Sequence, residues 1–251
     1  MSVMRLDLQA MKSANWQRIN MKKQTGFSLV ELMIAMLLGI IVVGGTIAMY
    51  VTTVRGGTNT INSARLNYDL DSVMQIMVND IRRAGYWGGA TVNSLAVNNP
   101  FTVSGTNAGI QISNKTGEED NSCILYTYDE DGDGTLETGE YFGFRHNGDG
   151  IDMRVGGAFS DCDGASWNNI IDSDKVVIEE LSFTANYKCL NVTQNDPEDG
   201  DCAGHIATGE KGVETRQIDI LLEGEVKGDD EVTKSLTGIV KVRNERIFIQ
   251  P

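Results

Sequence analysis

The chain has 251 residues and a formal net charge of −14, with 41% hydrophobic and 22% charged residues. This length holds one sizeable domain and a further element, or two small domains. The acidic balance argues against a protein that binds nucleic-acid phosphates through bulk positive charge, so no specific nucleic-acid partner is expected. Glycine is abundant at 28 residues and proline scarce at 3, which indicates a turn-rich β region.

The first twenty residues are polar and mixed, and they lack the apolar core of a secretory signal peptide. Met21, which precedes Lys22 and Lys23, offers a second start for the chain besides Met1. The residues leave both starts open.

An apolar run follows from Leu32 to Tyr50 and contains no charged residue. A helix needs about 20 such residues to cross the hydrocarbon core of a membrane. Lys22 and Lys23 place its amino end in the cytoplasm and everything after Arg55 outside. A cleaved secretory signal is the alternative, but its apolar region would be unusually long and would leave Glu31 unexplained.

Glu31 places a carboxylate at the edge of this apolar run. At the centre of a membrane such a group costs about 2.5–3.5 kcal/mol on insertion scales, and less near the edge. An acid here is a functional residue by default if it has a cationic partner. The alternative is an interfacial carboxylate that reaches back to water.

A helical pattern continues beyond the apolar run, over residues 55–85. Apolar side chains recur at spacings of three and four residues, at Leu66, Leu70, Val73, Met77, Ile81 and Ala84. Gly85 is the expected stop, and Gly56-Gly57 is an expected weak point between the two helical halves. The apolar stripe suits packing against a sheet.

After Gly85 the pattern changes to short β-like runs separated by turns rich in Gly, Asn and Asp. The runs occupy residues 109–112, 123–128, 141–145, 175–178, 217–222 and 238–242. Residues 147–150 are expected to form a simple hairpin turn. The chain is therefore predicted to be α+β, with one long N-terminal helix packed on an antiparallel β-sheet and a β-rich domain over residues 86–251.

All four cysteines follow the apolar run, and no Cys-x-x-Cys pair or compact Cys/His zinc spacing occurs. Cysteines confined to the outer side of an anchor indicate two disulfides in an oxidising compartment, against the alternative of buried free thiols. Of the three pairings that four cysteines allow, Cys189–Cys202 with Cys123–Cys162 is favoured, because the first closes a short polar loop.

The segment from Asp129 to Glu140 reads DEDGDGTLETGE and matches the calcium-loop pattern D-x-D-x-D-G-x5-E. In such a loop the side chains of the alternating acids and the closing acid, and one backbone carbonyl, bind Ca²⁺. The predicted ligands are Asp129, Asp131, Asp133, Thr135, Glu137 and Glu140. β-like runs rather than helices flank the segment, so a solitary calcium loop between strands is expected. The alternative is an acidic hairpin turn that binds no metal.

No catalytic constellation is found in the sequence. The two histidines, His146 and His205, lie far apart, have no nucleophile motif nearby, and are expected in loops. No glycine-rich phosphate loop precedes a helix. The chain is therefore not expected to be an enzyme, and no cofactor other than Ca²⁺ is predicted.

The residues from Lys22 to Glu31, KKQTGFSLVE, resemble the class III signal of type IV prepilins and pseudopilins. The resemblance implies that prepilin peptidase cuts between Gly26 and Phe27 and that the new amino group of Phe27 is methylated. It also implies a leader at residues 1–26, a transmembrane and filament-core helix at 27–54, and a pilin-like fold. Glu31 would then set assembly register by pairing with the amino terminus of a neighbouring pilin.

The segment from Asn79 to Gly89, together with Val242-Arg243-Asn244, is similar to minor pilins of the PilW type. Many major pilins have a helix-breaking proline in the membrane helix, and this helix has none. The resemblance implies a minor pilin of a type IV pilus or of its initiating tip complex, with roles in pilus biogenesis and in motility, adhesion or DNA uptake. The implied partners are other major and minor pilins, the inner-membrane assembly platform and, before assembly, membrane lipid.

The implied location is the bacterial inner membrane, with a single pass and a periplasmic C-terminal domain, followed by the filament or its tip. The nearest alternative is a type II secretion pseudopilin of the J type, which shares the fold. An alternative from another class is a membrane-tethered calcium-binding protein.

Overall fold

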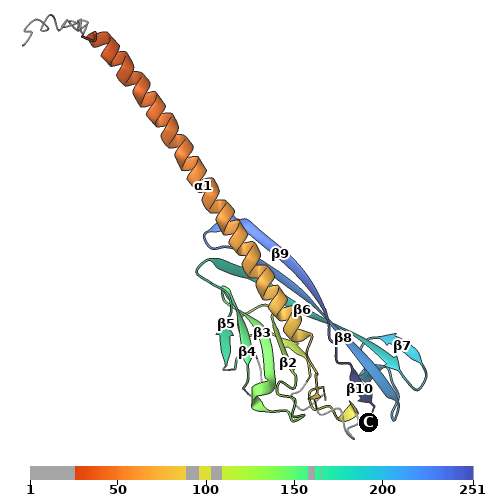
Figure 1. Ribbon diagram of the computed structural model, residues 1–251. Helices are drawn as coiled ribbons and strands as arrows, with labels where there is room; N and C mark the ends of the chain where they lie inside the picture. The colour runs from red at the N-terminus through yellow and green to blue at the C-terminus, as the bar shows by residue number, and fades with distance from the viewer. Residues whose placement is uncertain (1–25, 89–95, 103–108, 158–161, 165, 251) are drawn as a thin grey trace, which may run out of the picture. The chain divides into compact units, whose positions relative to one another are not determined.

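A computed structural model describes residues 26–88, 96–102, 109–157, 162–164 and 166–250 (Figure 1). The chain divides into two compact units, residues Met1–Arg55 and Gly56–Pro251. The α-helix α1, Leu29–Ile81, contributes its first half to one unit and its second half to the other. The expected α+β arrangement is confirmed.

In the first unit, every described side chain from residue 26 to 55 is exposed. Apolar side chains therefore cover the whole circumference of this half of α1, as the uninterrupted apolar run predicted. Gly56 and Gly57, the expected weak point, lie within the helix and do not interrupt it. Two glycines cost about 2 kcal/mol relative to alanine, too little to break a helix that continues for several turns on both sides.

In the second unit, the stripe predicted from the spacing of apolar residues faces the core. Leu70, Met77 and Ile81 have no exposed surface, and Leu66 and Val73 are almost as deeply buried. Gly85 follows the helix with a φ of +74°, a left-handed conformation that only glycine adopts readily. A side chain at Gly85 would also lie 2.7 Å from Thr102 Cγ2, so both conformation and space require glycine there.

The β region forms two antiparallel sheets. The first has the order β1-β2-β3-β4-β5, in which each strand pairs with the next along the chain. Its strands are β1 Gln111–Ser113, β2 Cys123–Thr127, β3 Tyr141–Asn147, β4 Gly150–Val155 and β5 Trp167–Asn169. Asn147 pairs with Gly150 at the end of the β3–β4 hairpin, so the hairpin turn predicted there is confirmed.

The second sheet is built around β8, Lys211–Val226. One edge of β8 pairs with β6, Val176–Asn191, and the other edge pairs successively with β9, Asp229–Lys241, and β10, Arg246–Ile249. β7, Asp196–Asp199, pairs with the far end of β6. Even-numbered residues of β8 are buried and odd-numbered ones are partly or fully exposed, as a strand with one face on the core requires.

One hydrophobic core joins the second half of α1 to both sheets. It includes Leu70, Met77 and Ile81 of the helix, residues of β2 and β3, and Leu181, Phe183, Ile218, Ile220 and Leu222 of the second sheet. Three short 3-10 helices complete the described elements: η2 Ala96–Asn98, η3 Thr138–Glu140 and η4 Cys202–Gly204.

One histidine prediction is wrong. His146 was expected in a loop, but it lies within β3 and is buried. Its neighbours in β3, Phe144 and Arg145, are buried as well, because this strand lies inside the molecule and is covered on both faces.

Candidate functional site

The first candidate site is the amino-terminal end of α1, where the sequence predicts peptidase cleavage. Gly26 and Phe27 precede the helix, and a side chain added at Gly26 would have no heavy atom within 4 Å. Phe27 is 80% exposed. Helical bonding begins where Leu32 N donates to Ser28 O at 3.1 Å, so the bond between Gly26 and Phe27 lies outside the helix.

Glu31 lies in the first turn of α1 and is exposed. A carboxylate in this turn is favoured by the positive end of the helix dipole. Apolar residues surround it on the helix surface: Leu29, Val30, Leu32 and Met33 are all more than 60% exposed. Glu31 is therefore a single acid on an otherwise apolar surface.

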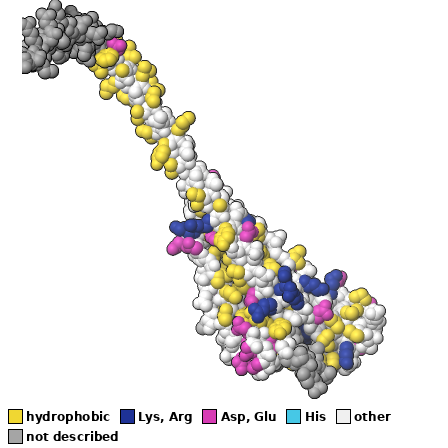
Figure 2. Space-filling view, in the orientation of Figure 1, with side chains coloured by type: hydrophobic (Ala, Val, Ile, Leu, Met, Phe, Trp, Pro, Cys, Tyr) yellow, Lys and Arg dark blue, Asp and Glu magenta, His cyan; other side chains and the backbone are white. Residues whose placement is uncertain are grey.

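The helix that carries these residues is the one described helix that is long and apolar enough to cross a membrane. Figure 2 shows the apolar side chains along its first half. None of this surface is covered within the described part of the first unit. Exposure of such a surface to water is unfavourable, so we expect lipid or other helices to cover it.

The second candidate site is the acidic loop that follows β2. The structure brings Asp129, Asp131 and Asp133 together, with one carboxylate oxygen of each within 4.8 Å of those of the other two. Asp131 and Asp133 are exposed, whereas Asp129 is completely buried. The Asp129 carboxylate accepts hydrogen bonds from the backbone N–H groups of Gly132, Gly134 and Gly88, at 2.7, 3.0 and 2.7 Å.

The other predicted calcium ligands are held differently. The two carboxylate oxygens of Glu140 accept hydrogen bonds from Glu130 N at 2.8 Å and Glu137 N at 2.9 Å. Thr135 N donates to Asp133. Glu137, Thr135 and Glu140 are not part of the close carboxylate group.

Burial raises the pKa of the Glu140 carboxyl group, and the charges of Asp129 and Asp131 raise it further, against the two backbone hydrogen bonds that lower it. The carboxylates of the loop thus repel one another. A bound cation would relieve that repulsion, which makes the donor set compatible with Ca²⁺.

The segment after α1 lies directly against the acidic loop, a contact that the sequence analysis missed. Trp87 Nε1 donates to Gly134 O at 3.0 Å. A Cβ atom at Gly88 would lie 2.8 Å from the Cα atom of Gly132, so only glycine permits this approach. The acidic loop is therefore tied to the end of the long helix. The closely spaced glycines of both segments were the available signal.

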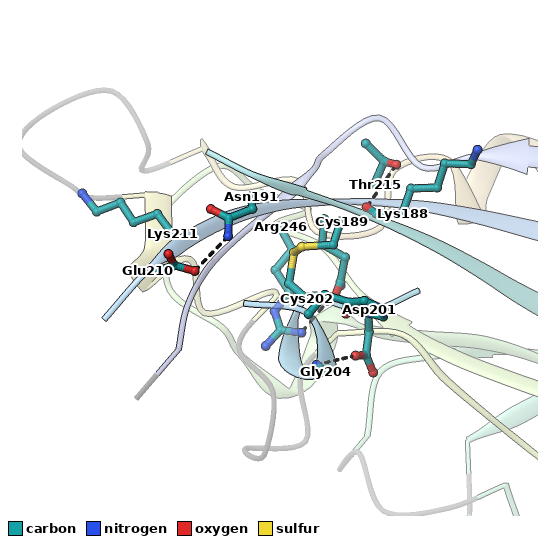
Figure 3. The surroundings of a disulfide bond; sticks show 12 residues. Lys188, Cys189, Asn191, Asp201, Cys202, Gly204, Glu210, Lys211, Thr215 and Arg246 are labelled. Carbon is teal, nitrogen blue, oxygen red and sulfur yellow. Dashed lines mark hydrogen bonds and ion pairs between the residues drawn. A yellow bond between two sulfur atoms is a disulfide. The ribbon is translucent and has the colours of Figure 1, made fainter. Parts of the chain in front are cut away.

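Both disulfides form as favoured from the sequence. Cys123 is bonded to Cys162 and Cys189 to Cys202, and the described part of the chain has no free cysteine. Figure 3 shows the Cys189–Cys202 disulfide with the side chains of Asp201, Thr215 and Arg246 around it. It closes the loop that carries β7, and all four cysteines are buried.

Comparison with known proteins gives two matches. A family model described as "Prepilin peptidase-dependent protein B" matches residues 59–242, which is more than half of the chain. A model described as "Prokaryotic N-terminal methylation motif" matches residues 21–47, the segment that contains Gly26, Phe27 and Glu31. No curated protein and no solved structure matches the chain.

Proposed function

The chain belongs to the prepilin peptidase-dependent protein B family and is a type IV pilin-like protein, and on this premise we propose that it is a minor pilin. In this proposal the precursor is anchored in the inner membrane, cut after Gly26 and methylated at Phe27. It then joins other pilins in a type IV pilus or in the tip complex that initiates one.

The observation that carries this proposal is the surface of the first half of α1. Its apolar side chains are exposed around the whole helix, directly after the cleavage signal. A membrane can cover that surface first and the helices of neighbouring pilins can cover it afterwards, since both environments are apolar. The assembly platform of the inner membrane would supply the transfer from one to the other.

Glu31 has a defined part in this proposal. Its carboxylate is stable in an apolar filament core only if a cation neutralises it. Cleavage at Gly26 creates a positive amino group on Phe27 of every processed subunit. Pairing between Glu31 and that amino group of a neighbour would set the axial register of the helix.

Mass spectrometry of the amino terminus tests the processing step. Chain isolated from a host with prepilin peptidase should begin at Phe27 and carry one additional methyl group. Chain from a peptidase-deficient host should retain residues 1–26. An amino terminus at any other residue would overturn the proposal.

Substitution of Glu31 tests the register step. Glu31→Ala should be cleaved normally but should lower the number of pili per cell, whereas the control Ser28→Ala, at the polar residue directly before the helix, should leave it unchanged. Counting pili by electron microscopy and measuring cleavage in the same cells separates the two steps. Normal piliation in Glu31→Ala cells would contradict the role of Glu31.

A type II secretion pseudopilin of the J type is the second candidate, and it rests on the similarity of Val242-Arg243-Asn244 to that group. Both candidates use the same processing and the same fold. Deleting the gene distinguishes them: loss of pili with intact protein secretion supports the pilin, and the reverse outcome supports the pseudopilin.

We also propose that the loop from Asp129 to Glu140 binds Ca²⁺. The support is the close approach of three carboxylates, Asp129, Asp131 and Asp133. In that case the ion would strengthen the attachment of the loop to Trp87 and Gly88 at the helix end.

Calcium titration of the full chain in detergent, followed by tryptophan fluorescence, tests this binding, because Trp87 lies against the loop. The wild-type signal should saturate with Ca²⁺, and Asp133→Asn should weaken apparent affinity at least about tenfold, since it removes a charged ligand. Glu130→Gln removes the same charge at a non-ligand position of the loop and should bind almost as well. Equal weakening in both variants would indicate a non-specific acidic surface.

A further inference from the structure

The ring of His146 lies where the two sheets meet, and it contacts a different segment on each side. Its Nε2 is 3.0 Å from the carbonyl oxygen of Ile178, at the start of β6 in the second sheet. Its Nδ1 is 3.1 Å from Oε2 of Glu118, in the segment between β1 and β2. The side chains of His146 and Glu118 are only 9% and 15% exposed.

Both partners of the ring are hydrogen-bond acceptors. A carbonyl oxygen only accepts, and so does an ionised carboxylate. A neutral imidazole has one N–H group and can donate to one of them, whereas an imidazolium donates to both. With the ring bonded to Ile178, the Nδ1–Oε2 contact therefore requires one further proton, carried either by the ring or by the carboxyl group.

Glu118 links this proton to the position of its own segment. Its second oxygen, Oε1, accepts a hydrogen bond from Gly148 N at 2.8 Å, in the β3–β4 turn. Lys115 Nζ donates to Asn147 Oδ1 at 2.7 Å, next to the same turn. The side chains of Lys115 and Glu118 thus hold the segment 114–122 against the end of the β3–β4 hairpin. The position of the Glu118 side chain depends on the proton shared with His146.

The neighbouring charged groups are engaged elsewhere. Arg145 pairs with Asp152 at 2.9 Å, and Asp149 pairs with Lys227 at 3.2 Å. Among the residues that the structure describes, Glu118 is the acidic side chain within 4.0 Å of the His146 ring. Glu118 is therefore the acidic group in direct contact with the ring.

We infer that His146 and Glu118 form a proton-operated latch between the segment 114–122 and β3. With the proton bound, the ring donates to both oxygens and the segment is held. Loss of the proton to solvent leaves a neutral ring that keeps its bond to Ile178 and turns a lone pair toward the Glu118 carboxylate. That repulsion releases Glu118 and loosens the segment.

Hydrogen–deuterium exchange of the full chain in detergent, between about pH 5.5 and pH 8.5, tests the latch. After correction for intrinsic exchange, protection of the amides in segment 114–122 should fall about tenfold with rising pH, the effect of one charged hydrogen bond. His205→Gln is the matched control: this exposed histidine lies outside the latch, so the variant should behave as wild type.

Glu118→Gln distinguishes the latch from a purely structural contact. The carboxamide introduced by this substitution can donate to the neutral ring and accept from Gly148 N, so the segment should stay protected at the upper pH. His146→Gln should make protection of the segment independent of pH. The inference is overturned if wild-type protection does not change with pH, or if Glu118→Gln loses protection with the same pH profile as wild type.

Discussion

A single side chain, Asn244, holds the turn that follows the long helix. Its Nδ2 donates to the carbonyl oxygens of Arg83 and Ala84, at 3.1 and 3.2 Å. Arg216 in turn donates to Asn244 O at 2.7 Å. The backbone N–H groups of Arg82, Arg83 and Ala84 donate to carbonyl oxygens of the last helical turn, and Asn244 then holds the turn that these residues form. This is a structural reason for the Val242-Arg243-Asn244 sequence.

Removal of the Asn244 side chain should destabilise the second unit. Asn244→Ala removes two hydrogen bonds and leaves the carbonyl oxygen of Ala84 without its side-chain donor, so it should lower the free energy of unfolding by about 1–2 kcal/mol. Chemical denaturation followed by circular dichroism measures the change. Asn186→Ala is the control, because Asn186 donates to Asp219 on the exposed face of the sheet and should cost less than about 0.5 kcal/mol.

Two tyrosines share one acid beneath the helix end. Tyr126 and Tyr128 both donate to the carboxylate of Asp80. Burial raises the pKa of the Tyr126 hydroxyl well above its ordinary value, and the negative charge of Asp80 is the second largest cause. The same two causes, in the same order, raise the pKa of Tyr128. Both groups therefore stay protonated in the folded chain when they would ionise in the unfolded one.

This difference predicts alkaline destabilisation. Unfolded tyrosine ionises near pH 10, so the stability due to the raised pKa values is fully present below about pH 10 and falls as pH rises above it. Each tyrosine should lower the folding equilibrium constant about tenfold per pH unit in that range. Tyr126→Phe should remove one of these two contributions, and Tyr68→Phe, at an exposed tyrosine, should not change the slope. Denaturation measured from about pH 9 to about pH 11 would show whether the slopes differ.

At the scale of elements, β8 and the Cys189–Cys202 disulfide constrain each other. A Cβ atom at Gly212 of β8 would lie 2.6 Å from Cys202 Sγ and 3.1 Å from Cys189 Sγ. The strand can pass beside the disulfide only because position 212 has no side chain. The loop that carries β7 is thereby packed on β8 as well as bonded to β6.

Gly212→Ala should force the strand and the disulfide apart. An overpacked core position typically costs about 1–3 kcal/mol, and thermal unfolding under oxidising conditions would report it as a lower melting temperature. Gly204→Ala is the control within the same loop, since a Cβ atom there meets only Asp201 Oδ1, at an ordinary 3.6 Å. Equal melting temperatures for the two variants would contradict the close packing.

The strands show which elements the residue pattern could reveal. Runs rich in Ile, Val and aromatic residues marked parts of β1, β2, β3, β6, β8 and β9. The pattern missed β4, β5, β7 and β10 and shortened β6, β8 and β9. The outer face of those long strands is polar, for example at Asn186 and Asp219, so strand pairing rather than composition determines how far they extend.

At the scale of the whole molecule, the hydrophobic core lies entirely within one unit. Its buried members run from Leu66 to Val242, and both disulfides fall in the same range. The described residues of the first unit, 26–55, contribute none of them. The folding of residues 56–251 should therefore not depend on the apolar first half of α1.

A fragment of residues 56–251 should accordingly be soluble without detergent and unfold in one cooperative transition. Circular dichroism during heating, in oxidising buffer, measures this. The full chain, with the exposed apolar surface of the first unit, should require detergent or lipid. A fragment that lacks a cooperative transition would show that the core needs the rest of α1.

Local sequence by itself determined the cleavage signal, the apolar and amphipathic halves of α1, the acidic loop and the expectation of two disulfides. These features depend on residue type, period and spacing along the chain. Other features depend on long-range contacts and were decided by the tertiary structure alone. They are the division into two sheets, the attachment of Trp87 and Gly88 to the acidic loop, the bonds of Asn244 to the turn after α1, and the burial of His146 against Glu118. The partners in these contacts lie tens to well over a hundred residues apart, so the spacing of residues along the chain does not predict which segments meet.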